Sequence, residues 1–129
     1  MRGSGTVLVI DDEELIRNYC KSALASYGYN VLLARDGAEG IQLFQEKANQ
    51  IGLVLLDVAM PGMDGSQTLE RIRHIRADVP VVVCSGFGDM EVEARFAGKQ
   101  IAGFFPKPYT VKQLARKVKE CIVAVEGGA

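Results

Sequence analysis

Short, almost wholly apolar runs alternate with longer amphipathic stretches along this chain, and that alternation restricts the folds it can adopt. Thr6–Ile10 (TVLVI) and residues 53–56 (LVLL) are nearly continuous in aliphatic side chains, as expected of strands that are covered on both faces. Residues 13–27 instead carry apolar side chains at helical spacing, and Gly28 is positioned to end that helix. Because strands that alternate with helices form a parallel sheet with helices packed on it, the sequence predicts an α/β fold.

The same alternation repeats five times. The expected strands are Thr6–Ile10, Asn30–Ala34, 53–56, 81–84 and 103–105. The expected helices are 13–27, Gly37–Lys47, 66–75, 89–97 and a last helix that Thr110 caps and whose inward stripe runs from Leu114 to Val125. Right-handed crossovers between such units give a doubly wound five-stranded parallel sheet with flanking helices. We expect one domain over residues 6–125, with residues 1–5 and 126–129 as tag or linker segments.

Composition and charge disfavour several classes of function. The chain has 129 residues and a formal net charge of -1, so bulk charge gives no reason to expect direct binding to nucleic acid or to a membrane surface. No apolar run approaches the length of a membrane span, and the amino terminus lacks the apolar stretch of a signal peptide. The three cysteines, Cys20, Cys84 and Cys121, form no CxxC motif. We therefore expect buried, reduced thiols in a cytoplasmic protein without membrane insertion.

Polar residues follow the expected strands at the point where each strand ends. They are Asp11, Asp12, Asp36, Asp57, Ser85 and Lys107. Because the carboxyl ends of parallel strands form one edge of the sheet, a ligand site is expected there. Carboxylates, a hydroxyl and an ammonium group at one edge can hold a divalent cation and a phosphoryl group, with Asp57 as the nucleophile. Singly, the same residues could be helix caps, turn residues or solvated charges. Their coincidence at one edge favours the site.

Four segments together carry a resemblance to a known family. They are Val9-Ile10-Asp11-Asp12-Glu13, residues 55–65 (LLDVAMPGMDG), Val82-Val83-Cys84-Ser85-Gly86 and Phe105-Pro106-Lys107-Pro108. In this order and spacing the chain resembles the receiver domain of two-component response regulators, from about Thr6 to Val125. The resemblance implies a (βα)5 flavodoxin-like receiver fold. The SGFG and FFPKPY stretches are similar to the receivers of hybrid sensor histidine kinases.

The resemblance also implies a role for each site residue. Asp12, Asp57 and the backbone carbonyl of Ala59 would bind Mg²⁺ directly, and Asp11 would bind it through water. Asp57 would take the phosphoryl group from a phosphohistidine, while Lys107 and Ser85 would contact its oxygens. Ser85 and Phe104 would then switch between two packings, and Pro108 would follow a cis peptide bond. Pro106 lacks an amide donor, so the last strand is expected to lose a ladder bond or end there.

The resemblance names partners by class. They are a sensor histidine kinase or phosphotransfer protein as donor, and an output domain or target at the face from the fourth to the fifth helix. It also allows a homodimer. Such a domain catalyses its own phosphorylation and dephosphorylation, and the parent protein could be a hybrid histidine kinase.

Two other functions stay open. The chain could be a pseudo-receiver that only binds proteins, or a phosphatase with an Asp nucleophile. Such phosphatases usually carry a second Asp two residues after the nucleophile, where this chain has Ala59. His74 is the single histidine, and its place on the expected helix 66–75 predicts a solvated surface side chain rather than a phosphorylation site.

Overall fold

A computed structural model describes residues 3–57, 65–85, 96, 101–106 and 109–122, with only the backbone described for Ser85, Phe104 and Pro106. The strands are β1 (Thr6–Ile10), β2 (Asn30–Ala34), β3 (Ile51–Asp57), β4 (Val81–Ser85) and β5 (Gly103–Pro106). The helices are α1 (Glu14–Ser26), α2 (Gly37–Lys47), α3 (Gly65–Ile75) and α5 (Val111–Cys121). The helix expected at residues 89–97 falls almost wholly outside the described residues.

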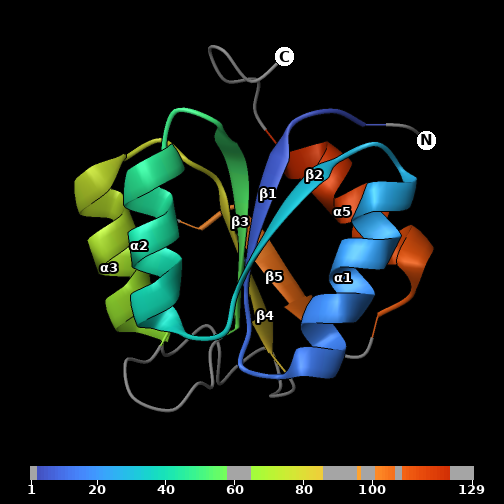
Figure 1. Ribbon diagram of the computed structural model, residues 1–129, viewed down its shortest axis with the longest axis horizontal. Helices are drawn as coiled ribbons and strands as arrows, with labels where there is room; N and C mark the ends of the chain where they lie inside the picture. The colour runs from blue at the N-terminus through green and yellow to red at the C-terminus, as the bar shows by residue number, and fades with distance from the viewer. Residues whose placement is uncertain (1–2, 58–64, 86–95, 97–100, 107–108, 123–129) are drawn as a thin grey trace.

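The five strands form one parallel sheet in the order β2-β1-β3-β4-β5. Helices α2 and α3 cover one face of this sheet, and α1 and α5 cover the other (Figure 1). This arrangement confirms the predicted parallel sheet with flanking helices. It also places β3 at the centre, so that the polar residue at its end lies in the middle of the sheet edge.

Apolar side chains of the central strands serve two separate cores. All five residues of β1 and all seven of β3 are buried, whereas the edge strand β2 is buried at Ala34 alone. Successive side chains of a strand point to opposite faces. Thus Leu8 and Ile10 pack with α2 and α3, while Val7 and Val9 pack with α1 and α5. The continuous apolar runs seen in the sequence are explained by this burial on both faces.

Specific residues end the strands and start the helices. Asp36 caps α2 by accepting a hydrogen bond from the Glu39 amide (2.8 Å). The predicted cap Thr110 forms a reciprocal capping box with Gln113 at the start of α5. Gly28 has a positive φ of 101° just after α1, as the sequence predicted for the residue that ends this helix.

Small differences from the predicted boundaries have local causes. Strand β3 begins at Ile51 rather than at residue 53, and the β1–β3 register shifts between Thr6 and Val7. Helix α5 ends at Cys121, so the predicted inward stripe is observed at Leu114 and Val118, while Val125 lies outside the described residues. Strand β5 ends at Pro106, as expected of a residue that cannot donate to the ladder.

The cysteines follow the prediction in part. Cys20 and Cys84 are buried, but Cys121 is half-buried at the end of α5. All three are free thiols. Among the described residues, no helix has the length and apolar character needed to cross a membrane.

Candidate functional site

Two strands bring the carboxylates together by their register. Ile10 of β1 is paired with Leu56 of β3. Asp11 and Asp57 are the next residues after this pair. They therefore stand at the same level of two neighbouring parallel strands, and Asp12 follows Asp11. The parallel register of β1 and β3 thus brings together Asp11 and Asp57, which are 46 positions apart in the sequence.

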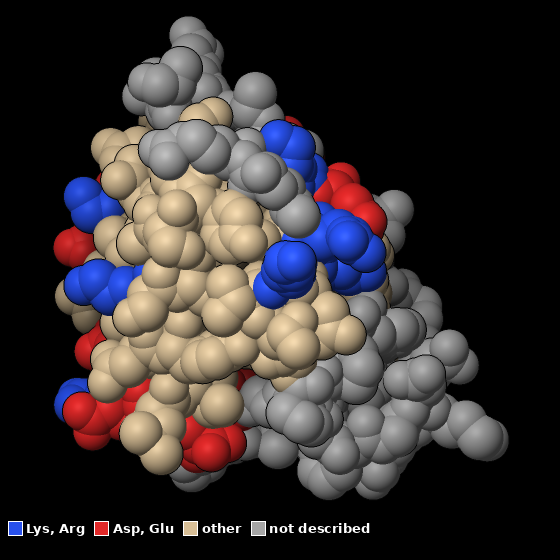
Figure 2. Space-filling model, turned by 90° about the vertical axis from the view of Figure 1, so that its right-hand side faces the viewer, with Lys and Arg blue, Asp and Glu red and all other residues tan. Residues whose placement is uncertain are grey.

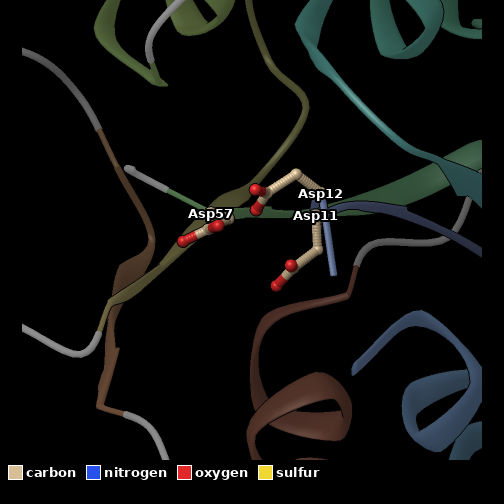
Figure 3. Close-up of side chains that lie close together, drawn as sticks. All are labelled: Asp11, Asp12 and Asp57. Carbon is tan, nitrogen blue, oxygen red and sulfur yellow. The ribbon is translucent and has the colours of Figure 1, made fainter. Parts of the chain in front are cut away.

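The carboxylates of Asp11, Asp12 and Asp57 lie at one edge of the sheet (Figure 3). One oxygen atom of each lies within 4.8 Å of the others. Asp11 and Asp57 are only 3% and 4% exposed, whereas Asp12 is exposed. The cluster therefore has two buried carboxylates, those of Asp11 and Asp57, and a third, that of Asp12, which is exposed to solvent.

Hydrogen bonds hold Asp11 in place. Its amide donates to the Ala34 carbonyl of β2 (3.1 Å), and its own carbonyl accepts from Arg17 Nη1 (2.9 Å). Its Oδ1 atom accepts from the Glu13 amide (2.9 Å). The last contact is a local turn of the kind that the helix-cap alternative predicts, but the residue at the N-cap position, Glu13, makes no side-chain cap bond. The hydrogen bond from Glu13 uses Oδ1 of Asp11, and the carboxylate has a second oxygen atom. Asp11 can therefore form the local turn and also take part in the cluster.

The donor set suits a hard cation. Three carboxylates supply oxygen ligands only, and crowding three negative charges is unfavourable unless a cation or proton offsets them. Magnesium uses few protein carboxylates and completes its shell with water and phosphate oxygens. No histidine or cysteine belongs to the cluster within the described part of the chain, which disfavours zinc.

The remaining predicted site residues are placed only in part. Asp36 does not join the cluster, because it caps α2 instead. Ser85 ends β4 one position beyond Cys84, the residue that pairs with Asp57, so its backbone stands at the same edge of the sheet. The backbone of Phe104 pairs with Val83 inside β5. Ala59, Lys107 and Pro108 lie outside the described residues.

Sequence reasoning missed a cluster of aromatic and thiol groups beside the carboxylates. The Tyr109 hydroxyl lies 3.1 Å from Cys20 Sγ of α1. Tyr19 Oη donates to the backbone carbonyl of Tyr109 (2.9 Å). The Tyr109 ring stacks on Phe105, with ring centroids 4.6 Å apart. The two contacts with α1 join residues about ninety positions apart, and the only local signal was the tyrosine that ends the FFPKPY stretch.

The electrostatic environment of Tyr109 follows from this placement. Burial is the main cause that raises the pKa of its phenol, and Cys84, Cys20 and Asp11 add to the same direction. Tyr109 therefore stays protonated, and its hydroxyl can serve as a hydrogen-bond donor or acceptor at all ordinary pH values.

A groove of about 440 Å³ lies on the molecular surface along α1, from Leu15 to Ser26, and reaches the start of α5. Its apolar lining includes Leu15, Tyr19 and Val111, of which Leu15 is 82% exposed. Figure 2 shows that uncharged side chains fill the centre of this face, with acidic side chains gathered at its lower end. Exposed apolar groups of this kind are typical of surfaces that contact other proteins.

Comparison with known proteins agrees with this geometry. A sequence model of the response regulator receiver domain matches residues 7–119. The chain belongs to the response regulator receiver domain family. It is 35% identical over 122 residues to the sensor kinase CckA of Brucella abortus, and this match covers 95% of the chain and 13% of the kinase. It is 34% identical to response regulator RR06 of Streptococcus pneumoniae, covering 90% of the chain and 52% of that protein.

Solved structures give the same family. The receiver domain of the hybrid histidine kinase CckA is 35% identical, with a TM-score of 0.76 over 90% of this chain and 97% of that chain. The chain therefore corresponds to nearly all of a receiver domain, while it spans about half of RR06 and a much smaller part of the kinase. The flavodoxin-like receiver fold expected from the sequence is confirmed.

Proposed function

We propose that this receiver domain accepts a phosphoryl group on Asp57 from a phosphohistidine, with Mg²⁺ as cofactor, and changes conformation in response. The observation that carries the proposal is the position of the Asp57 carboxylate. It is 4% exposed at the end of the central strand, within 4.8 Å of two further carboxylates. A buried carboxylate beside Asp11 and Asp12 fits an acceptor that reacts next to a bound cation.

The proposed reaction is a displacement at phosphorus. An Oδ atom of Asp57 forms the new P–O bond, the P–N bond of the phosphohistidine breaks, and the imidazole keeps the bonding electron pair. Mg²⁺ held by Asp12, Asp57 and the carbonyl of Ala59, with Asp11 acting through water, would neutralise charge on the phosphoryl oxygens and orient the group. Lys107 and the hydroxyl of Ser85 supply further positive charge and a hydrogen bond to these oxygens.

The donor is proposed to be a protein, either a sensor histidine kinase or a phosphotransfer protein. Asp57 is recessed, so the donor imidazole must come close to this edge of the sheet. The apolar groove lined by Leu15, Tyr19 and Val111 begins at the first turn of α1, which follows Asp11 and Asp12 in the chain, and offers a surface for that approach. Movement of Ser85 and Phe104, with Pro108 in cis, would carry the signal to the face between the fourth and fifth helices and to an output domain or target there.

A phosphorylation assay tests this function. The protein is incubated with Mg²⁺ and acetyl phosphate, and its intact mass is recorded over time beside Asp57→Asn, which keeps the side-chain shape but removes the nucleophilic oxygen. We expect one added phosphate on the parent and none on the variant. Turnover of an external phosphomonoester such as p-nitrophenyl phosphate would instead indicate a phosphatase, and an unchanged mass a domain that only binds proteins.

A further inference from the structure

The strongest unexplained feature of the molecule is the anchorage of Tyr109 to α1. Its hydroxyl lies 3.1 Å from Cys20 Sγ, and its backbone carbonyl accepts a hydrogen bond from Tyr19 Oη (2.9 Å). Its ring stacks on Phe105 at the end of the sheet, with an interplanar angle of 21°. Both the side chain and the main chain of one residue are therefore tied to the same helix.

Tyr109 lies only two residues after Lys107 in the sequence, so its attachment to α1 bears on the main chain near this lysine. Tyr109 follows the dipeptide Lys107-Pro108, and Pro106 precedes it. Pro106 is held in the sheet by its pairing with Ser85 of β4. Lys107 thus stands in the sequence between two anchored residues that are only three positions apart, Pro106 in the sheet and Tyr109 on α1.

We propose that Tyr109 is a positioning residue for phosphoryl transfer, because its attachment to Cys20 and Tyr19 fixes the main chain two residues after Lys107, the side chain assigned to the phosphoryl oxygens in the proposed function. This inference rests on the proposed function. A lysine is a flexible point charge, so its contribution depends on how well its backbone is held. The anchor also links the reaction to α1, since Tyr19 both holds the Tyr109 carbonyl and lines the surface groove.

A purely structural role predicts something different. If Tyr109 only filled core volume, phenylalanine would serve as well, because the ring and its stacking on Phe105 would remain. The hydroxyl makes no contribution to apolar packing, so its removal isolates the anchor. Tyr109→Phe retains the ring and the carbonyl that Tyr19 binds, and it deletes only the link to Cys20.

The test compares Tyr109→Phe with a matched control, Tyr29→Phe. Tyr29 belongs to the same apolar cluster and is 4% exposed, but it lies just before β2, at the opposite end of the sheet from the carboxylates. For each variant, two quantities are measured: the initial rate of phosphorylation by acetyl phosphate at saturating Mg²⁺, and the dissociation constant for Mg²⁺. The rate depends on Lys107, whereas the metal is held by the carboxylates.

We expect Tyr109→Phe to slow phosphorylation roughly three- to tenfold, the loss typical of one hydrogen bond, with an unchanged Mg²⁺ affinity. Tyr19→Phe should act in the same direction, and Tyr29→Phe should change neither quantity. An unchanged rate in Tyr109→Phe would overturn the inference, and so would a parallel loss of rate and Mg²⁺ affinity. Failure of the parent protein to take up phosphate would instead refute the proposed function, and the inference with it.

Discussion

Removing the charge of Asp12 should stabilise the protein when no divalent cation is present. Asp12 takes part in two repulsions, with Asp11 and with Asp57. The carboxylate oxygens lie within 4.8 Å of one another. At this upper limit of distance, two unit negative charges repel by about 1 kcal/mol in a water-like dielectric and about 3.5 kcal/mol at an effective dielectric constant of about 20. Asp12 is exposed, so the lower value applies to it, and the two repulsions together amount to about 2 kcal/mol.

Asp12→Asn is the suitable change, because it keeps the shape of the side chain. Unfolding by urea in the presence of a chelator should show a gain of about 1–2 kcal/mol in the free energy of unfolding, or an increase of about 3–8 °C in Tm. Adding Mg²⁺ at a hundred times its Kd should reverse the order, since this stabilises the parent by about 2.7 kcal/mol and the variant by much less.

The matched control is Glu46→Gln on α2, which changes the net charge of the protein equally but lies on an exposed helix surface away from the carboxylates. It should leave both the stability and the response to Mg²⁺ nearly unchanged. The reasoning is refuted if Asp12→Asn lowers stability in chelator and the variant then responds to Mg²⁺ as strongly as the parent does.

Three further predictions concern the stability of the fold. Arg76→Ala should lower the free energy of unfolding by about 1–3 kcal/mol, because Arg76 Nη1 donates to the backbone carbonyls of Ala48 and Ile51 at the start of β3. The control Asp78→Asn should cost little, because the Asp78 side chain is 82% exposed; urea titration measures both variants. Gly40→Ala should destabilise by about 1–2 kcal/mol despite the better helix propensity of alanine, because a Cβ atom there would lie 2.5 Å from Ile10 Cδ1; equal or greater thermal stability would contradict this. Burial raises the pKa of Tyr109, so its contribution to stability is complete below about pH 10 and is lost as the pH rises further, and Tyr109→Phe should weaken that alkaline loss in unfolding measured across this range.

The sequence predicted most of the fold because its strands are short and bounded by polar or turn residues. β1, β2 and α2 have the predicted limits. The start of β3 was wrong by two residues, because Gly52 interrupts the apolar pattern although it is buried inside the strand. A glycine weakens the local preference for a strand, but pairing with neighbours on both sides overrides it.

The carboxylate cluster was also predictable, since parallel register places strand ends at one edge. Asp36 shows the limit of that argument: it also follows a strand, but its side chain is used to cap α2. The Tyr109 anchor was not predictable. Cys20 was interpreted as a buried, reduced thiol, and only the packing of α1 against the segment between β5 and α5 brings its sulfur to a tyrosine hydroxyl.

Identifying the phosphorylated residue itself tests the central claim most directly. An acyl phosphate on a carboxylate is reduced by borohydride to an alcohol, which converts the modified aspartate into homoserine. The protein is treated with Mg²⁺ and acetyl phosphate, reduced, digested and sequenced by mass spectrometry. The account predicts homoserine in place of Asp57 and unchanged aspartates at Asp11 and Asp12. Homoserine at either of those two positions, or a phosphate that survives reduction on another residue, would contradict it.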